Sequence, residues 1–208
     1  VPAWSVMPPN DEQAIETLVK AFTDSKYDMR SVLRVLFLSD FFKDARFAKI
    51  KSPAEVVVGT LRMVGGFKFP APGIGDLAKQ SGYMGQELLN PPSVEGWHTG
   101  AEWINSGSLM KRINFSADMV GDTSRPGIQR IIQRLQAMGE LAPEPFGDNC
   151  LDQLGILEVE EGNRRQLVEH AMESGPLSWN TQEEKAASAE RVGEMLQLAV
   201  SLREYLYA

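Results

Sequence analysis

The sequence has very few residues of the kinds that bind metals or form disulfides. Its 208 residues include one cysteine, Cys150, and two histidines, His98 and His170. A single cysteine excludes a disulfide within the chain, and one thiol is compatible with either redox compartment. Because these residues lie far apart in sequence, they lack the close spacing of zinc ligands. We therefore expect no metal site, and we expect Cys150 to be a small buried hydrophobic residue.

Enzyme motifs are also lacking. Gly73-Ile-Gly75 has no third glycine and no preceding strand, so it does not match a dinucleotide-binding loop. The chain contains no Gly-x-Ser-x-Gly nucleophile elbow and no His-Glu-x-x-His zinc motif. We expect no cofactor, and the lack of these motifs favours a role other than catalysis.

Long apolar runs and strand patterns are scarce as well. A membrane span needs roughly 18–20 apolar residues. The longest candidate, residues 56–64, is interrupted by Gly59, Thr60 and Arg62, so we predict no membrane span. Alternating β-branched runs and Asn-Gly or Asp-Gly turns are missing. The sequence therefore predicts little or no β-sheet.

What the chain does contain is helical periodicity with start signals. Ser52-Pro53-Ala54-Glu55 is the clearest, because serine and glutamate at this spacing form a capping box and proline suits the first helical turn. Pro143 and Pro145 favour a loop. We predict an all-α, multi-helix fold with a long ordered loop, rich in proline and glycine, near residues 85–100. The predicted helix starts are Asn10, Asp28, Ser52, Asp76, Thr99, Pro126, Asn149, Asn163 and Thr181.

Charge divides the chain into two parts. Residues 1–120 carry 13 basic and 13 acidic groups, whereas residues 121–208 carry 8 basic and 15 acidic groups. The break coincides with a predicted hinge at 122–127. We predict a helical domain over 1–121 and an acidic helical subdomain over 122–208 packed on it. Because an acidic surface repels phosphate backbones, we expect no nucleic-acid partner.

One stretch, residues 85–112, concentrates the unusual residues. It holds two of the four tryptophans and one of the two histidines, together with several carboxyl and amide groups. We predict that its polar and aromatic residues form a candidate functional surface. The members are Gln86, Glu95, Trp97, His98, Glu102, Trp103, Asn105 and Arg112.

Two interpretations of this stretch stay open. In the first, indole faces bind a sugar ring or a cation and carboxylates do acid–base work, with Glu95 and Glu102 as a weak candidate pair for glycoside hydrolysis. In the second, which the sequence favours, the stretch is a rigid connector whose tryptophans, Trp97 and Trp103, are buried. In a separate set, Lys51, Glu55 and Arg62 are predicted to form a structural ion-pair network.

The order and spacing of several blocks resemble one bacterial family, the domain of unknown function 1800 family. The blocks begin with Lys51-Ser-Pro-Ala-Glu-Val-Val-Val-Gly-Thr-Leu-Arg62, followed by Gly85-Gln86 and Pro91-Pro-Ser-Val-Glu-Gly-Trp97. They continue with Trp103-Ile-Asn105 and Arg112-Ile-Asn-Phe115. Leu33–Phe42 and Leu196–Tyr205 are similar to family segments too, whereas 121–180 resembles it least.

The resemblance implies that the chain is the C-terminal portion of a longer protein. A missing N-terminal part would then be its first partner. Some members look exported, so we expect a cell-envelope or extracytoplasmic location and a second exported protein, or a glycan, as a further partner. The family supplies no reaction.

Three hypotheses for the function follow. The first, which we favour, is a non-enzymatic interaction or assembly module. The second is a glycan-binding or glycan-acting domain that uses residues 85–112. The third is half of an active site that the missing part completes.

Overall fold

The computed structural model describes residues 11–67 and 73–207. These residues form ten α-helices and two short 3-10 helices, with isolated β-bridges but no sheet, which confirms the predicted all-α class. In none of these helices is there a segment long and apolar enough to cross a membrane. The α-helices are α1 Glu12–Asp24, α2 Met29–Leu38, α3 Asp40–Lys43, α4 Pro53–Val64, α5 Ile74–Tyr83, α6 Ser106–Gly121, α7 Pro126–Ala137, α8 Pro143–Leu154, α9 Glu161–Glu173 and α10 Gln182–Ser201; the 3-10 helices are η1 Gly100–Trp103 and η2 Arg203–Leu206.

Several predicted helix starts have the expected chemistry. Asp28 accepts hydrogen bonds from the first turn of α2, and Pro126 occupies the first turn of α7. Capping boxes led by Ser52 and Thr181 start α4 and α10. The caps of α2, α4 and α10 satisfy backbone N–H groups that have no partner within the helix, whereas Pro126 suits the first turn because it has no N–H to satisfy.

Other starts lie elsewhere than predicted. Asn10 lies outside the described residues, and Asp11 caps α1 instead. The box led by Thr99 caps only η1, while Asn105 caps α6. Helix α8 begins at Pro143, not Asn149, because both prolines fall within the first turn, where no intrahelical N–H bond is lost.

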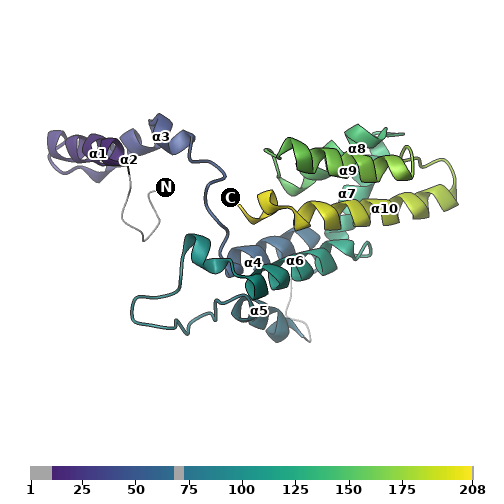
Figure 1. The fold of residues 1–208 in the computed structure, drawn as a ribbon, viewed down its shortest axis with the longest axis horizontal. Helices are drawn as coiled ribbons and strands as arrows, with labels where there is room; N and C mark the ends of the chain where they lie inside the picture. Colours follow the sequence, from purple (N-terminus) through teal and green to yellow (C-terminus); the bar gives the residue numbers. More distant parts are fainter. Residues whose placement is uncertain (1–10, 68–72, 208) are drawn as a thin grey trace.

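The main body is built around α4, α6 and α10, with α10 lying along α6 (Figure 1). Helices α7, α8 and α9 cover the other side of α10. One continuous core joins Val64 of α4 and Val120 of α6 to Leu135, Cys150 and Leu196 beyond the predicted boundary at 121/122. Cys150 is buried as predicted, and burial raises the pKa of its thiol. The acidic half therefore shares its core with the first half.

Glycines set the closest helix contacts. Gly127, at the start of α7, lies against the end of α4, where an added Cβ would be 1.9 Å from the carbonyl oxygen of Met63. At the α6–α10 crossing, a Cβ on Gly121 would be 2.2 Å from Nε2 of Gln197. At Gly127 the obstructing atoms are backbone, so α4 and α7 approach this closely only because the position has no side chain, whereas at Gly121 the nearest atoms belong to the flexible side chain of Gln197.

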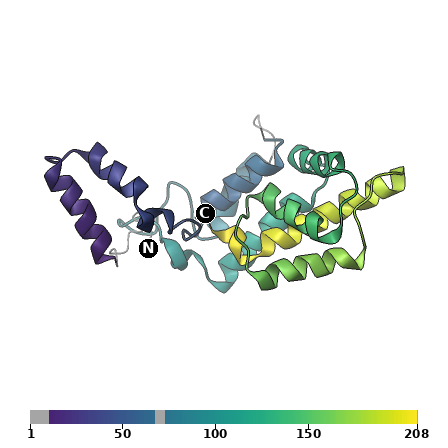
Figure 2. The ribbon, with the colours of Figure 1, turned by 90° about the horizontal axis from the view of Figure 1, so that it is seen from above.

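Helices α1 and α2 form an antiparallel hairpin that projects away from the body (Figure 2). The two helices pack on each other and α2 packs on α3. No residue of this hairpin belongs to either hydrophobic core found in the described parts of the chain. The hairpin buries only one residue, Leu36, among those described.

The contact at Gly127 leads to a stability prediction. We expect Gly127→Ala to lower the free energy of unfolding by roughly 2–3 kcal/mol, because the obstructing atoms are backbone and α4 and α7 must move apart. Gly162→Ala in α9 is the matched control, since an added Cβ there meets nothing within 4 Å. That variant is expected to be neutral or to stabilise by up to about 1 kcal/mol. Urea unfolding measures both; equal midpoints for the two variants would contradict the contact.

Candidate functional site

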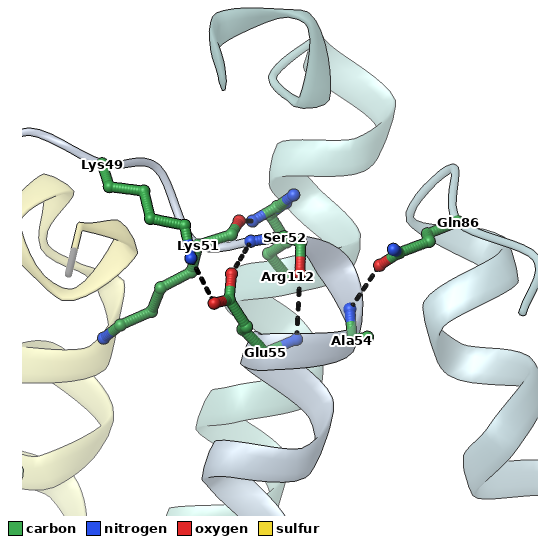
Figure 3. Close-up of polar contacts among 7 residues, drawn as sticks. All are labelled: Lys49, Lys51, Ser52, Ala54, Glu55, Gln86 and Arg112. Carbon is green, nitrogen blue, oxygen red and sulfur yellow. Dashed lines mark hydrogen bonds and ion pairs between the residues drawn. The ribbon is translucent and has the colours of Figure 1, made fainter. Parts of the chain in front are cut away.

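The structure separates the predicted surface into three groups. Gln86 and Arg112 converge on the start of α4, as Figure 3 shows. Trp103 and Asn105 lie at the start of α6. The remaining four, Glu95, Trp97, His98 and Glu102, belong to the long loop and to η1.

The start of α4 is saturated with hydrogen bonds. Ser52 Oγ accepts from the N–H of Glu55 at 3.3 Å, and the N–H of Ser52 donates to Oε2 of Glu55 at 2.7 Å. The N–H of Ala54 donates to Oε1 of Gln86 at 2.9 Å (Figure 3). The side chain of Gln86 therefore acts as a long-range cap for α4 that ties it to the end of α5. A helix start whose N–H groups are occupied in this way is not free to bind an anion.

Arg112 is fully buried on α6. Its Nη1 donates to the backbone oxygen of Lys51 at 2.7 Å. Burial lowers the pKa of Arg112, and the nearby charge of Glu55 opposes that shift. Nε and Nη2 have no hydrogen-bond partner among the described residues. Leaving a buried donor unpaired costs about 1–3 kcal/mol, so this arginine is held in place at a cost to stability.

Lys51 connects Arg112 to the end of the chain. Its backbone N–H donates to the backbone oxygen of Leu206, and its Nζ donates to the backbone oxygen of Tyr205, both at 2.8 Å. Nζ also lies 4.6 Å from the centre of the Tyr205 ring, within cation–π range. Burial lowers the pKa of Lys51, and the charge of Glu55 opposes the effect.

A buried hydroxyl cluster extends this connection into the core. The hydroxyl of Tyr205 lies 3.1 Å from Oγ1 of Thr60, which lies 3.4 Å from Oγ of Ser116. Burial raises the pKa of Tyr205, and these hydrogen bonds oppose it. We call Lys51, Thr60, Arg112, Ser116 and Tyr205 the clamp, because they join α4, α6 and the C-terminal segment. Thr60, Ser116 and Tyr205 were not predicted as site residues; the signal present in the sequence was hydroxyl groups among otherwise apolar neighbours.

The ion-pair prediction needs correction. Glu55 pairs with Lys49, which the prediction omitted, whereas Lys51 bonds to backbone oxygens. Arg62 is exposed and forms no ion pair within the described part of the chain. At the first turn of α4, both carboxylate oxygens of Glu55 accept hydrogen bonds, one from Lys49 and one from Ser52. Arg62 lies two helical turns away, which is about 10 Å along the axis.

The two tryptophans of the loop face different surroundings. Trp103 is buried, and its backbone oxygen accepts from Oγ of Ser108 at 2.6 Å. Trp97 is half-buried, and its Nε1 donates to the backbone oxygen of Glu87 at 3.0 Å. Only Trp97 therefore has an indole face in part accessible to a ligand.

The loop carboxylates are exposed. Oε2 of Glu102 lies 3.4 Å from Nδ1 of His98 and accepts from the N–H of Thr99 at 3.3 Å, which is a capping arrangement. Glu95 is also exposed. Nowhere in 11–67 or 73–207 do three or more His, Cys, Asp or Glu residues gather as metal ligands would. This arrangement brings Glu102 to His98 but leaves both open to solvent.

A cavity of about 250 Å³ lies beside the clamp, between the segment before α4, the α8–α9 turn and the C-terminal segment. Its wall includes Lys51, Glu158 and Glu204. Each of these charges already has a partner: Tyr205 for Lys51, Arg46 for Glu158 and Asn163 for Glu204. This cavity could not be predicted from the sequence, because its walls come from three segments that lie far apart in the chain.

Comparison with known proteins identifies a family. The model of a family described as "Protein of unknown function (DUF1800)" matches residues 4–207, nearly the whole chain. Neither a curated protein nor a solved structure matches the chain.

The capping box leads to a prediction about pH. Burial alone would raise the pKa of Glu55, but hydrogen bonds from Lys49 and Ser52 outweigh it and hold the pKa below its ordinary value. A lowered pKa in the folded state means that the charged form stabilises the fold above the ordinary pKa, and this contribution is lost as the pH falls. We expect Glu55→Gln to cost about 0.5–1 kcal/mol at pH 7.

The difference between wild type and Glu55→Gln should shrink as the pH falls from 6 to 3. Denaturant unfolding at each pH measures it. Glu95→Gln is the control, because its exposed carboxylate forms no ion pair with a described residue. A Glu55→Gln difference that stays constant down to pH 3 would refute the assignment.

Proposed function

The chain belongs to the family of proteins of unknown function DUF1800, and from this starting point we propose that it is a non-enzymatic interaction or assembly module. We propose that the α1–α2 hairpin carries the interaction surface. The observation that supports this most is the row of apolar side chains that the hairpin leaves exposed. A helical hairpin with so little burial needs a partner to cover its apolar face.

The exposed side chains fall at helical spacing. Ile15, Val19 and Phe22 of α1 are 37%, 54% and 36% exposed. On α2, Met29, Leu33 and Phe37 are exposed at the same kind of spacing, and Leu38, which is also exposed, lies outside this row. Scattered apolar residues are normal on protein surfaces, but contiguous stripes on a projecting element are typical of interaction sites.

Residues 85–112 have a different part in this proposal. The side chains of Gln86 and Asn105 cap helices, and Arg112 holds a backbone oxygen. These contacts favour the connector interpretation of the block. The glycan alternative then depends on Trp97, because Trp103 is buried.

A second candidate function has one specific observation in its favour. Nε and Nη2 of Arg112, which have no partner among the described residues, form one edge of the planar guanidinium. In proteins, this edge of an arginine commonly pairs with a carboxylate through two parallel hydrogen bonds. Because Arg112 has no exposed surface, another polypeptide segment could supply a carboxylate here only by displacing the residues that cover the guanidinium, which would make Arg112 part of a shared site. The envelope location and an exported partner stay predictions from the family resemblance.

The hairpin proposal predicts that its apolar face matters for association and not for folding. We expect Val19→Glu combined with Leu33→Glu to remove the chain from assemblies in the cells that normally produce it, measured by native-gel migration of the tagged chain. The free energy of unfolding of the main body should change by less than about 0.5 kcal/mol, because these are surface positions. Val58→Glu is the matched control, since Val58 on α4 is 51% exposed. Loss of assembly in both variants, or in neither, would contradict the proposal.

A further inference from the structure

We propose that the partner of the α1–α2 hairpin is the same hairpin of a second copy of this chain, joined by a two-fold axis into a four-helix bundle. The inference rests on the proposed interaction function and specifies its partner. Two features of the hairpin carry it: its apolar stripes share one face, and its two helices have opposite charge.

The first feature is the position of the stripes. The half-buried side chains of α1, such as Leu18, and the buried Leu36 of α2 mark the sides on which the helices meet. Successive residues of a helix are rotated by 100° about its axis. By this measure the exposed stripe of each helix lies about a quarter turn around the axis from the side that meets the other helix, and the direction of rotation is the same for both helices. Because the helices run antiparallel (Figure 2), equal rotations place both stripes on the same face of the hairpin.

The second feature is charge. Helix α1 carries three acidic residues and one lysine, and α2 carries two arginines and no acidic residue. Glu12 and Glu16 flank the α1 stripe on its outer side, and Arg30 and Arg34 flank the α2 stripe on its outer side. None of these four side chains forms an ion pair with any residue in the described ranges. The face is thus apolar in the middle, acidic along one edge and basic along the other.

Such a face complements itself. A two-fold axis parallel to the helices puts α1 of one copy over α2 of the other, so the acidic edge of each meets the basic edge of its partner. The facing helices are then antiparallel, as in many four-helix bundles. The axis perpendicular to the helices would instead put α1 on α1 and align like charges, which is unfavourable.

The size of the face suits a reversible dimer. Thirteen residues of α1 span about 20 Å, and two packed helices are roughly 20 Å wide. A face of this size covers about 400 Å², and its side chains roughen it, so the area buried per partner lies near or below the roughly 600 Å² at the lower end of the standard class. We therefore expect an equilibrium between monomer and dimer that responds to single charge changes.

Sedimentation equilibrium of the purified chain across a concentration series tests the proposal. The wild type should be a monomer–dimer mixture. Glu12→Lys with Glu16→Lys, and separately Arg30→Glu with Arg34→Glu, should each raise the dissociation constant at least tenfold. Mixing the two variants should restore dimers, because each acidic edge then meets a basic one. Val58→Glu on the body should dimerise like the wild type.

The remaining outcomes of these experiments distinguish the second-copy proposal from the proposed interaction function. A wild type that stays monomeric up to millimolar concentration, or a dimer that neither charge variant weakens, would overturn the second-copy proposal. If the wild type is monomeric but the Val19→Glu, Leu33→Glu variant still loses its cellular assembly, the interaction function stands with a different partner. Loss of both dimer and assembly in Val58→Glu would overturn both proposals.

Discussion

The hydrogen bond from buried Arg112 to the backbone oxygen of Lys51 is the constraint on which the rest of the body depends. A guanidinium with no exposed surface is costly, and only one of its nitrogens donates to a described residue. Its contact fixes the backbone immediately before α4. From there Lys51 reaches the C-terminal segment, and Tyr205 reaches Thr60 in the core. A single polar chain of contacts thereby sets the relative positions of α4, α6 and the end of the chain.

Apolar packing holds together the helices that the clamp positions. Helix α7 can pack closely on α4 because Gly127 has no side chain, and Gly121 and Gly193 lie where α10 crosses α6. Close packing at these points buries Val120 and Val192 completely. Burial of apolar surface provides the driving force. The glycines and the clamp determine which arrangement of the same helices achieves it.

Local features of this fold could be predicted and distant ones could not. The Ser52–Glu55 capping box is visible in sequence because its partners are three residues apart. The cap from Gln86 to Ala54 crosses 32 residues, and the bond from Arg112 to Lys51 crosses 61, so neither has a sequence pattern. The predicted surface joined Gln86 and Arg112 because both lie in residues 85–112, and in the structure both contact the segment where α4 begins. Trp97 and Trp103 were assigned to one surface because both are tryptophans, although Trp103 is buried and Trp97 is only half-buried. The hairpin surface was missed, because its apolar stripe has the same pattern as one that faces a core.

The central claim, that Arg112 couples the start of α4 to the C-terminal segment, is tested most directly by amide hydrogen exchange in Arg112→Met. Methionine keeps most of the volume but cannot donate to Lys51. We expect exchange to accelerate together at residues 51–57 and 205–207, two segments joined by the Lys51–Leu206 backbone bond, with the α1–α2 hairpin unchanged. Acceleration confined to α6 around position 112, or no acceleration at all, would contradict the account.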